Sequence, residues 1–418
     1  MSIPRGITAA PIHTPEWLVR QAVALRPVLL ANQAETERRT YYSERLHRAF
    51  LAAGFYRTLV PHRYGGLEFD VPTFLRLLIE LARGCASTAW CLGLAAGHSL
   101  QVGSYFEERA QEELFGDGDF RAAAVTAPTV TASENNGGWS LSGKVGYCSG
   151  IPYSTHFLGQ AVPAHGTAES PLLYVAPRSE WTMLDDWGDS LGLRGSGSHS
   201  IQFRDSAWIP QHWAIPDLNV GEAEVSDGTP GLRLHGNPLY AGRSRSVFTM
   251  TIAALAVGTG YQALDAYEEQ LRTRRTCFPP VGPRLADPDY QRWYGAAFAR
   301  LATARAALLH CADEHMALCA RGAHGGEPYG ALDEQRLAAI AREVTVQVWD
   351  IVAQELLRTV GATVLAAGTW FERVHRDLST IISHRNVSFR DPLHRGLAQL
   401  HLGIAPIVTD TPGDRHAR

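Results

Sequence analysis

The chain has 418 residues, of which 45% are hydrophobic and 19% are charged. This composition is typical of a folded globular protein and excludes a disordered or collagen-like chain. Lys and Arg number 38 against 42 Asp and Glu, which gives a formal net charge of −4, and the two signs are interspersed along the sequence. Because no basic patch for a nucleic acid or an anionic membrane is indicated, we expect small or uncharged partners.

The length favours about three domains. The 6 cysteines include no C-x-x-C pair, a usage typical of reduced thiols in a cytosol rather than of a secreted disulfide framework. The sequence has no run of about eighteen apolar residues, and its start lacks the apolar stretch of a signal peptide. We therefore expect a cytoplasmic protein.

The first part of the chain, to about residue 120, predicts helices because its apolar residues recur at spacings of three and four. Thr14-Pro15-Glu16 is a start signal, since a hydroxyl can accept an orphan N–H, proline suits the first helical position and an acid favours the positive end of the helix dipole. This helix should end near Thr40. Further helices are predicted at about 43–53, 72–84, 87–103 and 106–115.

The pattern changes near Arg121, where short β-rich runs separated by Gly, Asn and Pro predict antiparallel strands. The Asn-Asn-Gly-Gly run at 135–138 provides the positive φ angles of a tight hairpin, and the alternation over 139–145 predicts a strand with one buried face. Further strands are predicted at about 155–162, 171–176 and 199–209, followed by a polar connector at about 218–240.

The helical period returns near Arg243 and holds almost to the end, in segments near 243–273, 288–320, 332–360, 370–385 and 391–402. Long helices with small residues on their faces predict a close-packed antiparallel bundle. Doubly wound and barrel enzymes alternate strands and helices along the whole chain. Because the strands predicted here are confined to the middle, those folds are excluded. We expect a mainly α fold with domains at about 1–120, 121–228 and 229–418.

One motif, Gly258-Thr-Gly260-Tyr-Gln-Ala263, resembles the glycine-rich loop that binds a dinucleotide pyrophosphate. The residues before it fit a helix as well as a strand, and no second strand with an acidic end follows. We therefore favour close packing of helices through small residues over a nicotinamide site.

A second motif places Cys311, His315 and Cys319 at spacings of four, on one face of a helix, next to His310 and Glu314. Soft ligands in such a row could hold zinc, but a structural zinc site usually draws ligand pairs from separate elements. No second pair is in sight, so we expect no metal and a buried helix face instead.

Two loops of small residues have many exposed donors: Lys144-Val-Gly146-Tyr147-Cys148-Ser149-Gly150, and Leu193-Arg194-Gly195-Ser196-Gly197-Ser198. Such loops can approach a flat or anionic ligand closely. Each could equally be a strand end or a surface turn, and the residues alone leave both interpretations open.

Two histidines lie in apolar or mixed helical segments: His98, and His384, which follows Arg376 and Asp377. A single histidine in such surroundings is usually a satisfied core residue, and Arg376 beside Asp377 would form a structural ion pair by default. An imidazole with an ordinary pKa near ~6.5 can also give or take a proton at neutral pH, so a catalytic role stays open.

Taken together, these features resemble the acyl-CoA dehydrogenase superfamily, and within it the oxygenase components of two-component flavin monooxygenases such as the hydroxylases of hydroxyphenylacetate. The resemblance covers nearly the whole chain. It is carried by 60–66 (VPHRYGG), 84–90 (GCASTAW), His98, 141–150 (LSGKVGYCSG), 192–198 (GLRGSGS) and 372–377 (ERVHRD) with His384 seven residues later.

The resemblance implies an N-terminal α domain, a central antiparallel β-barrel-like domain and a C-terminal four-helix bundle, with a flavin between the β domain and the bundle in a homotetramer. It implies that reduced FAD or FMN reacts with O₂ to a C4a-hydroperoxyflavin, which oxygenates the substrate. His98 would then deprotonate or hydrogen-bond the substrate, Ser149 would contact the flavin near N5, and His384 would assist the hydroperoxide. Further flavin contacts are expected at Tyr147, Arg194, Gly195, Ser196 and Ser198.

Since the sequence contains nothing that resembles an NAD(P)H domain, a separate flavin reductase is the expected partner. We expect hydroxylation of an aromatic or polyketide-type small molecule in a specialised pathway, with N- or S-oxygenation as the alternative. An ordinary acyl-CoA dehydrogenase is the other alternative. That chemistry needs a carboxylate base. The bundle offers four acids, Glu343, Asp350, Glu355 and Glu372, and the sequence does not assign any of them to this role.

Overall fold

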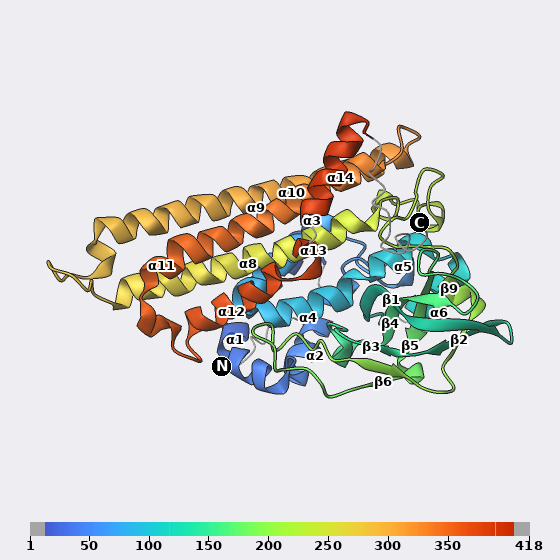
Figure 1. Cartoon of the computed structure of the whole chain (residues 1–418), viewed down its shortest axis with the longest axis horizontal. Helices are drawn as coiled ribbons and strands as arrows, with labels where there is room; N and C mark the ends of the chain where they lie inside the picture. Colours follow the sequence, from blue (N-terminus) through green and yellow to red (C-terminus); the bar gives the residue numbers. More distant parts are fainter. Residues whose placement is uncertain (1–12, 117, 389, 405–418) are drawn as a thin grey trace, which may run out of the picture.

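The computed structural model describes residues 13–116, 118–388 and 390–404 (Figure 1). Helices come first along the chain, strands occupy the middle and long helices follow, which is the expected order. Figure 1 shows the strands gathered at one end of the molecule, with the long helices extending away from them.

The N-terminal helices begin at side-chain caps. Thr14 accepts the N–H of Trp17 at its Oγ1 over 3.2 Å, and Ser43 and Asp70 cap the next helices in the same way. The helices are α1 (Pro15–Arg39), α2 (Glu44–Ala52), α3 (Val71–Gly84), α4 (Ala86–Gly97), α5 (Ser99–Tyr105) and α6 (Glu108–Phe115).

The helix expected over 87–103 is two helices, so that prediction is wrong in one respect. α4 ends at Gly97 and α5 begins at Ser99, with His98 at the junction. The Ser99 hydroxyl donates to the carbonyl of Ala96 over 2.8 Å, a local bond of the kind that competes with a helix ladder. The break therefore gives His98 a position of its own between two helices.

The central strands form a six-stranded sheet in the order β8-β2-β1-β4-β5-β9 and a three-stranded sheet in the order β3-β7-β6. They are β1 (Ala122–Asn135), β2 (Gly138–Ser142), β3 (Lys144–Val145), β4 (His156–Pro163), β5 (Leu172–Pro177), β6 (Trp181–Met183), β7 (Ile201–Phe203), β8 (Trp208–Pro210) and β9 (Ala214–Ile215). Buried residues between the two sheets form a second core, which includes Trp181, Tyr174 and Phe203.

The expectation of purely antiparallel strands is wrong for one pair. β1 and β4 run parallel, and their register shifts between Val125 and Val130, while the other strand pairs are antiparallel. Such irregularities commonly re-aim side chains next to a functional site. The barrel-like β domain is thus a mixed sheet with an irregular first strand.

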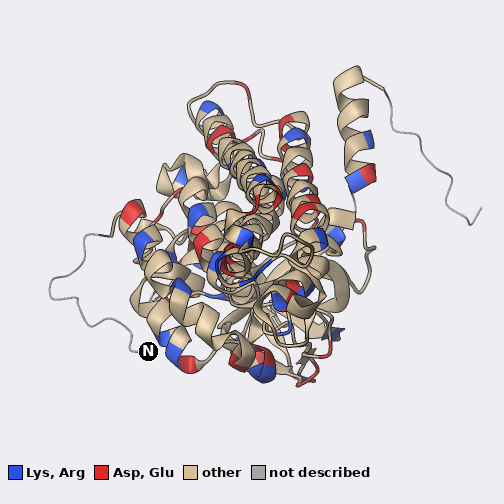
Figure 2. Cartoon of the chain, turned by 90° about the vertical axis from the view of Figure 1, so that its left-hand side faces the viewer, with Lys and Arg blue, Asp and Glu red and all other residues tan. Residues whose placement is uncertain are grey.

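The C-terminal part is a bundle around α8, which follows the short helix α7 (Pro230–His235). Its helices are α8 (Ser244–Thr273), α9 (Pro288–Ala323), α10 (Ala331–Asp350), a π-helical turn (Ile351–Leu356) with α11 (Leu357–Val360), α12 (Trp370–Ile382), α13 (Arg385–Ser388) and α14 (Arg390–Leu402). Figure 2 shows basic and acidic residues interspersed on these helices, in keeping with the charge pattern of the sequence.

The glycines of the dinucleotide-like motif lie inside α8 and bring helices together. A Cβ atom on Gly258 would lie 2.6 Å from Cβ of Ala82 in α3, and one on Gly260 would lie 2.8 Å from Leu301 in α9. This confirms the interpretation as helix packing. α8 is also long and apolar enough to cross a membrane, but 89% of its apolar window is buried inside the protein.

The domain divisions expected after residues 120 and 228 remain predictions. The first falls between Phe115, where α6 ends, and Ala122, where β1 begins. The second falls between β9 and α7. Buried residues of α1, α3, α8 and α10 belong to one continuous hydrophobic cluster, so the helical regions share a core.

Candidate active site

A hollow lies where α4 and α5 face the beginning of α8, and we call it the His98 hollow. It holds about 340 Å³ of empty space, part of it open to solvent. It is lined by Gly93, Leu94, Gly97, His98, Leu100, Gln101, Ser244, Val247, Phe248 and Thr251. The described lining contains no Asp, Glu, Lys or Arg, so the hollow suits a flat, mainly apolar ligand with a few polar groups.

His98 contributes a neutral imidazole to this hollow. Its ring is 4% exposed, and burial lowers its pKa to about 4. Nδ1 lies 2.7 Å from the carbonyl oxygen of Ala122, the first residue of β1. A carbonyl can only accept, so Nδ1 carries the proton and Nε2 keeps a lone pair. The imidazole is therefore neutral at neutral pH and presents a hydrogen-bond acceptor at Nε2.

His384 lies between α12 and α13, and aromatic rings connect its position to His98. The ring of Phe248 lies near both imidazoles, with its centroid 6.3 Å from that of His98 and 6.5 Å from that of His384. Burial, together with the charges of Arg342 and Arg385, lowers the pKa of His384 to about 4. The structure thus brings the two histidines near one apolar side chain.

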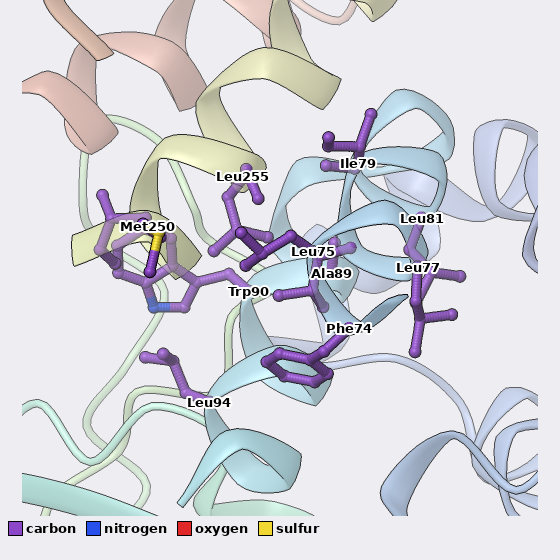
Figure 3. Packing of buried hydrophobic residues seen from close by; sticks show 14 of the residues in the cluster. Phe74, Leu75, Leu77, Ile79, Leu81, Ala89, Trp90, Leu94, Met250 and Leu255 are labelled. Atoms are coloured by element: carbon purple, nitrogen blue, oxygen red, sulfur yellow. The ribbon is translucent and has the colours of Figure 1, made fainter. Parts of the chain in front are cut away.

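Trp90 of α4 connects His384 to Ser149. Its ring meets His384 edge-on at 5.2 Å, and its Nε1–H donates to the Ser149 Oγ over 3.0 Å. Figure 3 shows Trp90 and Leu94 on α4 facing Met250 on α8. Trp90 is 3% exposed, so it keeps water away from the space between the helices.

Ser149, Ser198 and Ser196 form a chain of hydroxyls. The Oγ atoms of Ser149 and Ser198 are 2.7 Å apart, and those of Ser198 and Ser196 are also 2.7 Å apart. Because the indole N–H donates to Ser149, the Ser149 hydroxyl can direct its own proton to Ser198 or to a ligand. The three hydroxyls are buried and bonded to one another, and Ser149, Ser196 and Ser198 remain predicted flavin contacts.

Gly195 holds this chain against the N-terminal helices. Its N–H donates to the Ser87 Oγ over 3.3 Å, and a Cβ atom here would lie 2.4 Å from Cγ2 of Thr36. The site therefore tolerates only glycine, which is a packing requirement.

Tyr147 and Arg194 lie at the outer side of the same loops. Tyr147 has a φ of +60° and is 77% exposed, and its ring meets that of Trp187 at 5.6 Å. Arg194 is half-buried and donates through Nε to the Ser190 carbonyl over 2.8 Å. Both remain predicted flavin contacts.

The expected ion pair between Arg376 and Asp377 is wrong. Arg376 pairs with Glu37 at 2.9 Å and with Glu372 at 2.5 Å. Asp377 instead accepts the N–H of Leu193 at Oδ1 over 2.7 Å, and burial raises its pKa to about 7. This bond attaches the 192–198 loop to α12, seven residues before His384.

Sequence reasoning missed the three residues that connect the predicted site, Trp90, Phe248 and Gln101. Trp90 and Phe248 lie in apolar helical stretches, where an aromatic residue usually indicates core. Gln101 was detectable as a long polar side chain three positions after His98, in a helix whose other residues are small or apolar apart from Tyr105. Its side chain lines the hollow, and its Oε1 is buried without a hydrogen-bond partner among the described residues.

The motif around His315 forms a packed cluster. His315 Nδ1 lies 3.2 Å from the Ser246 Oγ and 3.1 Å from the Tyr329 hydroxyl, and Nε2 lies 3.5 Å from the Cys319 Sγ. In the described part of the chain no group of three or more His, Cys, Asp or Glu side chains is placed to hold a metal. This cluster lies in the helical bundle, and none of its residues lines the His98 hollow.

Comparisons with known proteins agree with this architecture. The sequence matches the N-terminal domain of acyl-CoA dehydrogenases over residues 19–113 and their C-terminal domain over residues 250–389. The flavin-dependent monooxygenase oxygenase subunit HsaA of Rhodococcus jostii is 29% identical over 367 residues, which cover 85% of this chain and 90% of that protein. The oxygenase component of an FADH2-dependent resorcinol hydroxylase from Rhizobium is 26% identical over 391 residues, which cover 90% and 91%.

Solved structures share the fold. A hydroxylase from Rhodococcus superimposes with a TM-score of 0.82 at 24% identity, covering 93% of this chain and 98% of its own. XiaF from Streptomyces, solved with FADH2 and glycerol, gives 0.83 at 24% identity, covering 94% and 97%. The chain therefore belongs to the acyl-CoA dehydrogenase superfamily, and its relatives identify it as a flavin-dependent monooxygenase within it.

Proposed function

We propose that this chain is the oxygenase component of a two-component monooxygenase that hydroxylates an aromatic or polyketide-type small molecule in a specialised pathway. Reduced FAD or FMN would arrive from a separate reductase. The observation that carries the proposal is the neutral imidazole of His98, with its proton fixed on Nδ1 by Ala122, at the wall of an apolar hollow. Relatives that are oxygenase components of aromatic hydroxylases support it.

The flavin would lie beside the loops that hold the hydroxyl chain. Its predicted contacts are Tyr147, Ser149, Arg194, Gly195, Ser196 and Ser198, and the rotatable hydroxyls can satisfy a ring edge that both donates and accepts. Reduced flavin, when bound, would supply the two electrons that activate O₂, and one atom of that O₂ enters the substrate. The protein residues have to bind the flavin and the substrate, orient them toward each other and keep water out of the site.

His98 is proposed to accept a proton at Nε2 from a hydroxyl of the substrate. Removal of this proton makes the substrate ring more electron-rich and so more reactive toward an electrophilic oxygen. Trp90 and Phe248 exclude water between the histidines. His384, whose ring lies 6.5 Å from that of Phe248, is proposed to donate or relay a proton where oxygen reacts.

The dehydrogenase alternative needs a carboxylate that faces the substrate. Glu343 pairs with Arg390 at 2.6 Å, Glu355 with Arg300 at 2.9 Å and Glu372 with Arg376 at 2.5 Å. None of these acids belongs to the described lining of the His98 hollow, and neither does Asp350. The hollow therefore favours oxygenation over abstraction of an α-proton by a carboxylate.

The test is to mix the protein with chemically reduced FAD or FMN, ¹⁸O₂ and a panel of phenols, and to measure the product mass. We expect one ¹⁸O atom per product molecule and none without flavin. Amines and sulfides added to the panel test the alternative, because N- or S-oxygenation would give labelled hydroxylamines or sulfoxides without a base at His98. Oxidation of an acyl thioester with no labelled product would overturn the proposal.

His384→Ala provides a second measurement on the same proposal. Without this imidazole, more of the consumed oxygen should be released as hydrogen peroxide and less should enter the product. An unchanged ratio of product to oxygen consumed would remove His384 from the mechanism. We also propose a cytoplasmic homotetramer, for which the mass of the protein in solution by light scattering is the test of assembly.

A further inference from the structure

A second, smaller hollow adjoins the His98 hollow, and Gln101 lines both. The space at the second hollow, part of it open to solvent, is about 170 Å³. Its other lining residues come from β1, β4, β5 and the following connector: Ala124, Val125, Thr126, Leu158, Gly159, Gln160, Leu173 and Val220. The Gln101 side chain therefore lines both the His98 hollow, which lies between helices, and the second hollow, which lies beside the strands.

The side-chain carbonyl of Gln101 has no hydrogen-bond donor among the described residues. Its side chain is 8% exposed, and Oε1 is buried without a partner among the described residues. Gln160, on the other side of the second hollow, differs because its Oε1 accepts the N–H of Val220 over 3.3 Å. A buried polar atom without a partner costs about 1–3 kcal/mol, so the Gln101 carboxamide is suited to a ligand that brings a donor.

His98 and Gln101 are three residues apart, a spacing that places side chains on the same side of a helical turn. Both side chains line the His98 hollow. A ligand that offers one hydroxyl to His98 Nε2 can therefore offer a second polar group to Gln101. The second hollow lies on the strand side of the same Gln101 side chain.

Charge limits the ligand further. The described lining of the two hollows contains no Lys, Arg, Asp or Glu. A carboxylate bound there would lose its hydration without gaining a cationic partner, which is costly. The ligand should therefore be uncharged along its length.

We propose that Gln101 is a specificity-determining residue, and that the two hollows together bind an elongated, neutral hydroxyaromatic molecule whose second hydrogen-bonding group is held by the Gln101 carboxamide. This inference rests on the proposed function for the nature of the reacting ring. It adds the shape, charge and polar pattern of the substrate.

The test compares three two-ring probes of the same shape: a naphthalenediol with one hydroxyl on each ring, naphthol, and the corresponding hydroxynaphthoate. Their dissociation constants are measured by equilibrium dialysis with the full chain, with and without flavin. We expect the wild-type protein to bind the diol about tenfold more tightly than naphthol, a difference that corresponds to one buried hydrogen bond. The hydroxynaphthoate should bind most weakly of the three.

Gln101→Leu should remove the preference for the diol and leave naphthol binding within about twofold. The control is Gln262→Leu in α8, because Gln262 is also buried with an unpartnered Oε1 but lines neither hollow. This control should keep the preference. If Gln101→Leu does not fold, Gln101→Met tests the same loss with an unbranched side chain.

A preference for the diol that survives in the Gln101 variant, or a wild-type protein that binds hydroxynaphthoate most tightly, would overturn the inference. The proposed function fails separately. Loss of ¹⁸O incorporation with the binding preference intact would contradict oxygenation but not the role of Gln101. Hydroxylation without any binding preference would contradict only the role of Gln101.

Discussion

His98 and His315 have the same electrostatic character and different surroundings. His98 is 4% exposed and His315 is 1% exposed, and burial lowers the pKa of each to about 4. Both ring nitrogens of His315 lie against neighbouring side chains in the bundle. His98 has its Nδ1 fixed by a backbone carbonyl and its ring at the wall of a hollow.

The comparison teaches that a lowered pKa reports burial, and that access to a ligand decides whether an imidazole can react. At His315 a ligand would have to displace Ser246, Tyr329 or Cys319. At His98 the space exists already. The experiments below separate the two histidines by rate, by stability and by pH dependence.

The largest expected effect is on rate. His98→Ala should lower kcat/KM for a hydroxyaromatic substrate by about 10²–10⁴-fold, because the proton acceptor is lost. Steady-state product formation with reduced flavin in excess measures this change. The thermal unfolding temperature serves as the control for folding. A loss smaller than tenfold in a folded variant would show that His98 is no more reactive than His315.

The second effect is on stability. His315→Ala should lower the free energy of unfolding by about 2–4 kcal/mol, because it leaves a cavity and deprives the Ser246 and Tyr329 hydroxyls of a partner. Urea denaturation measures the loss. The kcat/KM of the folded variant should stay within twofold of the wild type. A large fall in kcat/KM without destabilisation would give His315 a functional role and break the comparison.

The smallest expected effect is on the pH dependence of stability. It concerns Asp377, a buried carboxyl whose pKa is raised, whereas the pKa values of His98 and His315 are lowered. The pKa of Asp377 is raised to about 7 from an ordinary 3.8, so the folded protein binds more protons than the unfolded chain between these pH values. Its contribution to stability is thus lost as pH rises from about 4 to about 7. The two histidines act oppositely: their lowered pKa values remove stability as pH falls from 6.5 toward 4.

Asp377→Asn should keep the acceptor for the Leu193 N–H and remove the titration. The unfolding temperature of the variant should therefore fall less than that of the wild type between pH 5 and pH 8, by a few degrees. Parallel curves for the two proteins would contradict the raised pKa.

The sequence allowed the class of fold and the family to be predicted because period and order are local properties. The three- and four-residue spacing predicted the bundle, and alternation predicted the strands. The direction of pairing between β1 and β4 was not predictable, since alternation of apolar residues is the same in a parallel and an antiparallel strand. The break at His98 was hidden because the apolar residues continue from α4 into α5.

The candidate site was predictable only as separate residues. Small-residue loops and isolated histidines indicated positions, and the resemblance gave them expected roles. Contacts such as Leu193 with Asp377 join residues 184 positions apart, and no local pattern encodes them. Gln101 was overlooked for a similar reason, because the second hollow that its side chain lines is formed by strands that begin more than twenty residues later.

The hydrogen bond from Leu193 to Asp377 has a consequence for cooperativity. It fastens a loop of the sheet region to a late helix of the bundle, while Gly195 of the same loop is fastened to α4. A chain that ended before α12 would leave the amide of Leu193 buried without an acceptor. The sheet and the bundle should therefore unfold in a single calorimetric transition rather than in two separate transitions.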